Sequence, residues 1–391
     1  MAASLLELRK FVIPEIIIGI DARLLINRYI AHFNAQKPMI VTDKQVQHFR
    51  WFQETIDLIH PAVEQLIFFD EITPNPKDFE AMLGADLFLS QNCDLLIAIG
   101  GGSAIDCAKC ISIVASNGGN ILDYEGVDEV QMPGPPLICI PTTAGSSADV
   151  SQFAIIKDTS TNIKRAIISK KVVPDLALID PVPLMTMDPY LTGCTAMDAL
   201  THAIEAYVSN THSALTDIHA LEAIKLINQE IENAVNPQRT IETMFQLMLG
   251  SLHAGLAFSN ASLGAVHAMS HALGGLLDLP HGECNSILLE HIIRFNFAAV
   301  PDRYQMIAKQ LGLLVNNADA SILLETIINH IILIREKLHI PATLTVARLD
   351  EMTIDYLIEN ALYDPCMVTN PKVLTKDEVR IIYGRILQSQ K

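Results

Sequence analysis

The feature that most constrains the fold is a series of short, uninterrupted apolar runs in the first half of the chain. Four of these runs predict buried strands: Pro38–Val41, Leu66–Phe69, Asp94–Ile99 and Leu137–Ile140. Because the runs lack polar alternation, we expect strands that are buried on both faces, as in a parallel sheet. Segments with helical spacing lie between them, such as His48–His60 and Lys77–Gln91. Strands that alternate with helices favour βαβ units and an α/β domain.

The pattern changes after about residue 190, where long helical periodicity takes over. Asp198–Val208, Ser213–Asn233 and Ile241–Phe258 are predicted helices, and the hydroxyl of Thr240 is suited to cap the last of them. Few strand signals occur in this half. We therefore expect an α/β domain with a parallel sheet over residues 1–187 and an all-α domain over residues 188–391.

The composition excludes several classes of protein. Half of the residues are hydrophobic, which is typical of a folded chain rather than a disordered one. The formal net charge of −17 argues against nucleic acid as a partner. No apolar run approaches the roughly 20 residues that a bilayer requires, so we expect no membrane partner. The start of the chain carries Glu7 and lacks a long apolar stretch, and we expect no signal peptide.

The cysteines indicate a reducing compartment. There are seven, an odd and scattered set, which fits free thiols in a cytoplasmic protein. Cys107 and Cys110 form a CxxC pair, but they lie well inside a predicted helix. We interpret them as two small apolar residues on one helix face rather than as a redox pair.

A glycine-rich loop follows the third predicted strand. The residues Gly100-Gly101-Gly102-Ser103 leave the strand and open a helix. Glycines let the backbone approach a ligand closely, and a helix start offers free N–H groups to a pyrophosphate. Asp106 falls in the first helical turn, where a carboxylate also favours the helix dipole. The loop is not GxGxxG, so an ordinary Rossmann fingerprint is excluded, and a simple tight turn is the alternative interpretation.

Two more polar positions follow neighbouring strands. The segment Pro141–Ser147 carries the hydroxyls of Thr142 and Thr143 directly after the fourth strand. Asp43 comes just after the first strand, where it is placed either to accept from ribose hydroxyls or to cap a turn. Open α/β sheets bind ligands at the carboxyl ends of their strands, so these positions together predict a nucleotide site.

Histidines are crowded into one quarter of the chain. Eight of the 13 lie between His202 and His291. Asp198 and His202 are spaced i, i+4 on a predicted helix, and His267 and His271 repeat that spacing before His281. A carboxylate with several imidazoles suits a divalent first-row metal, and these groups would be costly to bury unpaired. The spacing leaves open whether His271 is a ligand. The remaining four histidines, at 212, 219, 253 and 291, are interpreted as structural.

Taken together, these motifs resemble the iron-containing (group III) alcohol dehydrogenase family. The similarity runs over nearly the whole chain and includes GGGSAIDCAK at 100–109, PTTAGSSADV at 141–150, MDALTHAIEAY at 197–207, GAVHAMSHALGG at 264–275, PHGECN at 280–285 and DPCMVTNP at 364–371. The resemblance implies a dehydroquinate synthase-like fold, in which an N-terminal dinucleotide-binding domain precedes a helical metal-binding domain. It also implies a homodimer or larger homo-oligomer.

The resemblance assigns candidate roles residue by residue. It implies metal ligation by Asp198, His202, His267 and His281, with Fe²⁺ as the expected ion and Zn²⁺ as an alternative. His271 becomes a residue near the nicotinamide that relays a proton. The implied NAD contacts are Asp43, Asn75, Gly101, Gly102, Ser103, Thr142, Thr143 and Lys164, to which the loop chemistry adds Asp106. Phe258 and Cys366 would line the substrate channel.

These roles predict a metal-dependent NAD(H) alcohol dehydrogenase that interconverts primary alcohols or diols and aldehydes. Two alternatives are a metal- and NAD-binding sensor with little turnover, and a polyol dehydrogenase of the same superfamily. Enzymes of that superfamily that bind phosphorylated or anionic substrates should need basic residues near the metal. Between Lys225 and Arg294 the sequence has only Arg239, which favours a small uncharged alcohol or aldehyde.

One loop departs from the family pattern. The family commonly has PTTAGTGSEV, whereas this chain has PTTAGSSADV at 141–150. Glycine is replaced by Ser147, serine by Ala148 and glutamate by Asp149. We expect the difference to affect cofactor contacts and substrate range more than the hydride chemistry.

Overall fold

The computed structural model describes residues 10–313, 319–346 and 349–389. The expectation about a signal peptide falls largely on residues outside this range. Contacts divide the chain into two units, which we call the sheet unit and the helical unit. The sheet unit comprises Val12–Met187 and Thr240–Met248, and the helical unit comprises Met1–Phe11, Asp188–Arg239 and Leu249–Lys391. The division of function between residues 1–187 and 188–391 stays a prediction.

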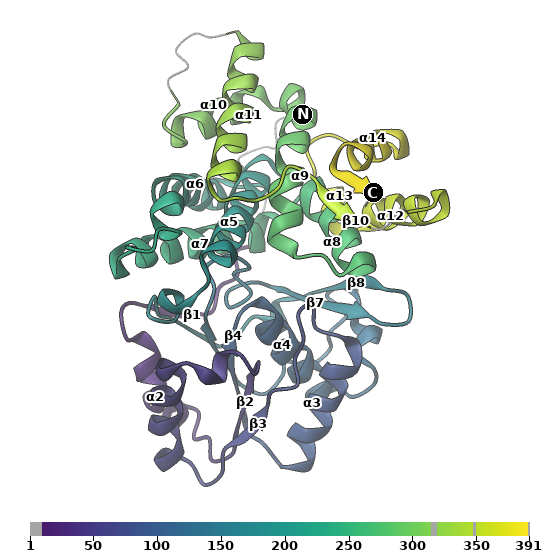
Figure 1. The fold of residues 1–391 in the computed structure, drawn as a ribbon. Helices are drawn as coiled ribbons and strands as arrows, with labels where there is room; N and C mark the ends of the chain where they lie inside the picture. The colour runs from purple at the N-terminus through teal and green to yellow at the C-terminus, as the bar shows by residue number, and fades with distance from the viewer. Residues whose placement is uncertain (1–9, 314–318, 347–348, 390–391) are drawn as a thin grey trace. The chain divides into compact units, whose positions relative to one another are not determined.

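The sheet unit is built on a six-stranded parallel sheet (Figure 1). Its strands, in spatial order, are β1 (Glu15–Ile18), β9 (Leu176–Ile179), β6 (Leu137–Pro141), β4 (Leu95–Gly100), β2 (Pro38–Thr42) and β3 (Ile67–Phe69). The four predicted strands are confirmed as β2, β3, β4 and β6. The edge strand β1 and its neighbour β9 were not predicted.

Helices cover both faces of this sheet. They are α1 (Ile26–His32), α2 (Arg50–Ile59), α3 (Asp78–Ser90) and α4 (Gly102–Asn117). Alternate residues of β4 enter different cores: Leu96 and Ala98 pack with residues of α3 and α4, whereas Ile97 packs with residues of α1 and α2. The central strands β2, β4 and β6 are therefore buried on both faces, as their unbroken apolar runs predict.

A second, three-stranded sheet follows β6. It has the order β5-β8-β7, with β5 at Gly126–Val127, β8 at Ile163–Ile168 and β7 at Phe153–Asp158. Strands β7 and β8 form an antiparallel hairpin. Asp158 closes its turn by accepting hydrogen bonds from the backbone and side chains of Ser160 and Thr161.

The helical unit confirms the predicted helical C-terminal part. Its helices are α5 (Pro189–Val208), α6 (Ala214–Ala234), α8 (Ala265–Leu277), α9 (His281–Asn296), α10 (Pro301–Gln310), α11 (Ala320–Lys337), α12 (Glu351–Tyr363), α13 (Pro365–Val368) and α14 (Lys376–Ile386), together with the later part of α7 (Ile241–Ala261). Asp188 caps α5, and Thr240 accepts from Thr243 N at 3.2 Å, which is the predicted cap of α7. The unit also contains a short parallel pair, β10 (Leu344–Val346) with β11 (Leu387–Ser389), that the sequence analysis did not anticipate.

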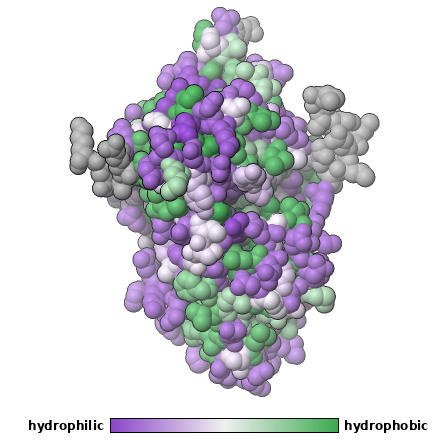
Figure 2. Space-filling view, turned by 90° about the vertical axis from the view of Figure 1, so that its right-hand side faces the viewer, coloured by the Kyte–Doolittle hydropathy of each residue, from purple (hydrophilic) through white to green (hydrophobic). Residues whose placement is uncertain are grey.

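The face of the molecule in Figure 2 is mixed in character. Figure 2 shows a face on which hydrophilic and hydrophobic residues are interspersed. Within the described residues, no helix combines the length and the apolar character that crossing a bilayer needs.

Candidate active site

The glycine loop lies at the C-terminal end of β4, and the hydroxyl-rich loop lies beside it. Gly100 pairs with Pro141 at the ends of the neighbouring strands β4 and β6, and Thr142 N donates to Gly100 O at 3.0 Å. The loops are closely packed, because a Cβ added at Gly101 would lie 3.2 Å from Thr143 Cγ2. Parallel pairing of adjacent strands thus places the two predicted phosphate-binding loops together.

Asp43 lies at the point where the chain reverses the direction in which it adds strands to the sheet. The chain runs outward from β2 to β3 and then returns to β4 on the other side of β2, which is the switch point where open α/β sheets bind ligands. Asp43 Oδ1 accepts from Gln45 N at 2.9 Å and Val46 N at 3.0 Å, so one oxygen caps a turn. The other oxygen would lie 3.7 Å from a Cβ at Gly100, beside the glycine loop. The turn-capping interpretation of Asp43 is therefore confirmed for one oxygen, and its contact with ribose stays a prediction.

Asp106 lies near two lysines in the sheet unit. Burial raises the pKa of its carboxyl to about 7, against the opposing influence of Lys109 and Lys164. Lys109 is fully buried and donates from Nζ to Ser151 O at 2.8 Å and Phe153 O at 2.7 Å. Lys109 thus ties α4 to β7, and Lys164 lies within electrostatic range of Asp106. Asp106 lies beyond the first turn of α4, so the prediction that it falls in that turn was wrong. The sequence analysis did not identify Lys109.

Asn75 precedes α3 in a left-handed backbone conformation, with a φ of 54°. The next residue, Pro76, accepts from Lys157 N at 2.8 Å, which attaches this segment to β7. Asn75 therefore remains a candidate cofactor residue on a well-anchored turn.

The departure from the family pattern has a backbone consequence. Ser147, which stands where the family commonly has glycine, has a φ of 48°. This left-handed region costs a residue with a Cβ about 1 kcal/mol, whereas glycine adopts it freely.

We expect Ser147→Gly to raise the free energy of unfolding by ~0.5–1 kcal/mol in urea denaturation. The neighbouring change Ser146→Gly is the control, because Ser146 does not have a positive φ, and a comparable gain there would contradict this explanation.

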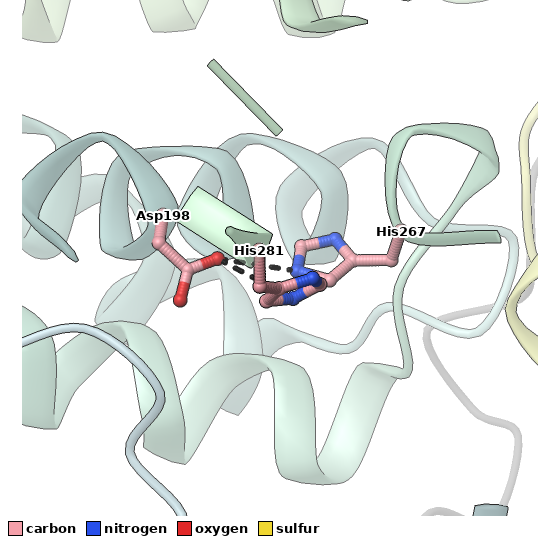
Figure 3. A group of neighbouring side chains, drawn as sticks. All are labelled: Asp198, His267 and His281. Carbon is pink, nitrogen blue, oxygen red and sulfur yellow. Dashed lines mark ion pairs between the residues drawn. The ribbon is translucent and has the colours of Figure 1, made fainter. Parts of the chain in front are cut away.

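The metal-ligand candidates converge from three helices of the helical unit. Asp198 and His202 lie one turn apart on α5, His267 lies on α8, and His281 is the first residue of α9. Asp198 Oδ1 is 3.8 Å from His202 Nε2 and 3.7 Å from the Nε2 atoms of His267 and His281. Figure 3 shows the carboxylate of Asp198 facing the rings of His267 and His281. The turn before α9 and the start of α8 thus bring Asp198, His267 and His281 into one group, and His202 adjoins it through Asp198 and by stacking on His267.

The geometry and charge of this cluster suit a divalent cation. Ligands about 2.1 Å from a tetrahedral ion lie roughly 3.4 Å apart, close to the separations found here. Asn285 Nδ2 donates to Asp198 Oδ1 at 2.6 Å and lies 3.1 and 3.2 Å from the Nε2 atoms of His267 and His281, so three acceptors converge on one donor. Burial opposes ionisation of Asp198, but the three histidines outweigh it and hold its pKa well below the usual range. The donor set therefore presents an anion and the imidazoles of His267 and His281 to one position, and His202 faces the same carboxylate.

The cluster has supporting residues that the sequence analysis missed. Burial would lower the pKa of His267, but the nearby carboxylates of Asp198 and Glu205 raise it to about 9. Ser270 Oγ lies 3.0 Å from His281 Nδ1. A Cβ at Gly282 would lie 2.4 Å from Cys194 O, so glycine is required directly after His281. Glu205 was detectable in principle, because it follows His202 by three residues on the same helix.

His271 belongs to a second group that touches the first. Its Nδ1 lies 2.8 Å from Asp364 Oδ2, and its ring stacks on that of His281 with 5.3 Å between centroids. Cys366 lies in the same group, and burial raises the pKa of its thiol well above the usual value. Phe258 stacks on His202 with 4.4 Å between centroids. Both candidate substrate residues thus lie beside the histidine cluster, although the partner of His271, Asp364, was not foreseen.

The four remaining histidines have local partners. His212 Nδ1 lies 3.3 Å from Asp217, and His291 Nε2 lies 3.7 Å from Glu290. The Nδ1 atoms of His219 and His253 are 2.8 Å apart. These contacts are consistent with the structural roles expected for them.

Comparison with known proteins identifies the class. Residues 14–181 match the iron-containing alcohol dehydrogenase profile, and residues 192–387 match the C-terminal domain of the Fe-containing alcohol dehydrogenase family. The chain belongs to this family, which confirms the resemblance and the fold.

Individual relatives cover almost the whole chain. The NAD-dependent methanol dehydrogenase of Bacillus methanolicus is 36% identical over 96% of this chain and 99% of its own length. The 1,3-propanediol dehydrogenase of Citrobacter freundii is 34% identical over 89% of this chain and 90% of its own. A solved structure of a 1,3-propanediol oxidoreductase superposes with a TM-score of 0.92 at 32% identity, covering 97% of this chain and 100% of the other.

Proposed function

We propose that this protein is an NAD-dependent, metal-dependent alcohol dehydrogenase that interconverts primary alcohols or diols and aldehydes by hydride transfer. The observation that carries the proposal is the convergence of three histidine Nε2 atoms within 3.8 Å of one carboxylate oxygen. The family to which the chain belongs and its similarity to alcohol and diol dehydrogenases support the same reaction.

The residues that would hold each cofactor lie on different units. Asp198, His202, His267 and His281 would hold Fe²⁺, with Zn²⁺ as a competitor that binds such sites more tightly in general. Such an ion supplies a Lewis acid that lowers the pKa of an alcohol, and NAD supplies the hydride acceptor. Gly101, Gly102 and Ser103 would bind the pyrophosphate through the start of α4, with Thr142 and Thr143 alongside. We propose Asn75, Asp106 and Lys164 as further cofactor contacts.

Asp43 supports NAD as the cofactor rather than NADP. Its second carboxylate oxygen lies beside the glycine loop, where it is placed to accept from ribose hydroxyls. A 2′-phosphate in the same place would meet a like charge. The carboxylate therefore selects against the phosphorylated cofactor.

His271 is proposed to relay the proton that the alcohol loses. Its Nδ1 is held by Asp364, so its Nε2 is the nitrogen left to exchange a proton. Phe258 and Cys366 are proposed to shape the substrate channel beside it.

The substrate is proposed to be small and uncharged. Arg239 is the one basic residue between Lys225 and Arg294 in the sequence, and its Nη1 lies 3.4 Å from Thr192 Oγ1 and 3.3 Å from Ala234 O. It is thus engaged at a helix end, which disfavours phosphorylated substrates. We further propose a cytoplasmic homodimer or larger homo-oligomer, supported by the seven free cysteines and by the family resemblance.

The test is an anaerobic NADH assay of the protein loaded with Fe²⁺ or Zn²⁺. We expect NADH formation from members of a panel of C2–C4 alcohols and diols, and NADH consumption with the corresponding aldehydes. Competent metal and NAD binding without turnover on any member would instead support the sensor function. Light scattering tests the oligomeric state.

A further inference from the structure

Glu205 makes three hydrogen bonds from a buried position next to the metal-ligand candidates. It lies on α5, and its residue is 3% exposed. Its Oε2 lies 2.6 Å from His267 Nδ1 and accepts from Gly264 N at 3.1 Å. Its Oε1 accepts from Val266 N at 2.7 Å. The carboxylate therefore joins the start of α8 and the imidazole that this helix carries.

These contacts determine which nitrogen of His267 carries a proton. A carboxylate can only accept, so the 2.6 Å contact requires a proton on Nδ1. Metal ligation requires the neutral imidazole, whose single ring proton then stays on Nδ1 and leaves a lone pair on Nε2. That Nε2 is the atom 3.7 Å from Asp198 Oδ1. Glu205 thus aims the lone pair at the other candidate ligands.

We propose that Glu205 is a positioning residue that locks His267 in the Nδ1–H tautomer and so sets the metal affinity of the cluster. The proposal rests on the proposed ligand set. His281 is held differently, because its Nδ1 faces the neutral hydroxyl of Ser270 at 3.0 Å. At Nδ1, His267 thus faces a buried carboxylate, whereas His281 faces a hydroxyl.

The site is built to admit this carboxylate. A Cβ at Gly264 would lie 2.8 Å from Glu205 Oε1, so the residue before α8 must be small. Asn370 Oδ1 takes the adjacent backbone group, Ala265 N, at 3.2 Å. The side chains of Glu205 and Asn370 therefore both accept from backbone N–H groups at the start of α8, and of these two Glu205 is the one that contacts His267. The helix-capping role and the tautomer-setting role can be separated by mutating each in turn.

The test compares Glu205→Gln with Asn370→Ser. Glutamine keeps the shape of glutamate but has one acceptor oxygen and one NH₂ group. Its NH₂ must therefore replace one of the two carboxylate oxygens, and it then faces either the N–H of Val266 or the N–H groups of Gly264 and His267. We expect Zn²⁺ affinity, measured by competition with a chromophoric chelator, to fall ~10–100-fold in Glu205→Gln. Asn370→Ser should lower the melting temperature but leave Zn²⁺ affinity within about threefold of wild type, because it does not touch the ligands.

The outcomes separate the possibilities. Unchanged Zn²⁺ affinity in Glu205→Gln, or an equal loss in both variants, would overturn the positioning role. If Glu205→Gln does not fold, ¹⁵N spectra of histidine-labelled, Zn²⁺-loaded wild type still decide: His267 should show a protonated Nδ1, and a protonated Nε2 would overturn the proposal. Failure of wild type to bind any divalent metal would count against the proposed function itself.

Discussion

A His267→Ala variant is expected to lose bound metal and to reduce kcat/KM for alcohol oxidation by ~10³-fold or more, since metal assistance is worth several kcal/mol and each 1.36 kcal/mol is tenfold in rate. His267 is 1% exposed, and its Nε2 faces Asp198 while its Nδ1 faces Glu205. The truncation removes one of the four candidate ligands and one contact from each of the two carboxylates. Metal content by elemental analysis and steady-state NADH kinetics measure the two effects.

The matched control for this variant is His291→Ala. His291 lies on α9, the same helix as His281, but its nearest acidic partner is Glu290 and not Asp198. We expect the control to keep its metal and to change kcat/KM by less than about threefold. Full metal content and near-normal turnover in His267→Ala would exclude His267 from the ligand set.

A Gly102→Ala variant is expected to weaken NAD binding by ~10–100-fold, since the loop must let a pyrophosphate approach the backbone. The added Cβ would also lie 2.7 Å from Ser146 Oγ and 2.8 Å from Ser146 Cβ. Titration calorimetry with NAD measures the change. Gly19→Ala is the control, because nothing lies within 4 Å of a Cβ there.

A second substitution separates the two causes of that loss. Gly102→Ala combined with Ser146→Gly removes the side chain that the new Cβ would meet. Recovery of NAD affinity in the double variant would attribute the loss to loop distortion, and no recovery would attribute it to direct obstruction of the cofactor. Wild-type affinity in Gly102→Ala alone would mean that the cofactor does not bind on this loop.

The parts of the fold that the sequence predicts well are those determined by local patterns. The apolar run at Leu137–Ile140 corresponds to β6, which is one residue longer. A strand that is buried on both faces can be recognised from its own apolar residues, without knowledge of the strands beside it. The β7–β8 hairpin was missed, since Lys157, Lys164 and Arg165 interrupt its apolar character. Short strands such as β10 depend on a partner more than 40 residues away and leave little local signal.

The candidate site shows the same division. Spacing alone put His267 and His271 on one helix face, but it could not distinguish the ring that faces Asp198 from the ring that faces Asp364. The family resemblance made that distinction. The spacing of Glu205 from His202 marks it only as a neighbour of a ligand, and Asn285 follows His281 in the same way. The partners of both, His267 and Asp198, lie on other helices that are distant in sequence.

The arrangement of the ligands on α5, α8 and α9 has a consequence for the life of the protein in a cell. An ion held by all four side chains would cross-link three helices whose ligands span residues 198 to 281. A metal that binds only the native state, at a free concentration 1,000 times its dissociation constant, raises the free energy of unfolding by about 4 kcal/mol. In a cell that lacks the metal, this protein would be less stable, and proteases would degrade it faster. The abundance of the protein should therefore follow the supply of metal, even when its synthesis does not change.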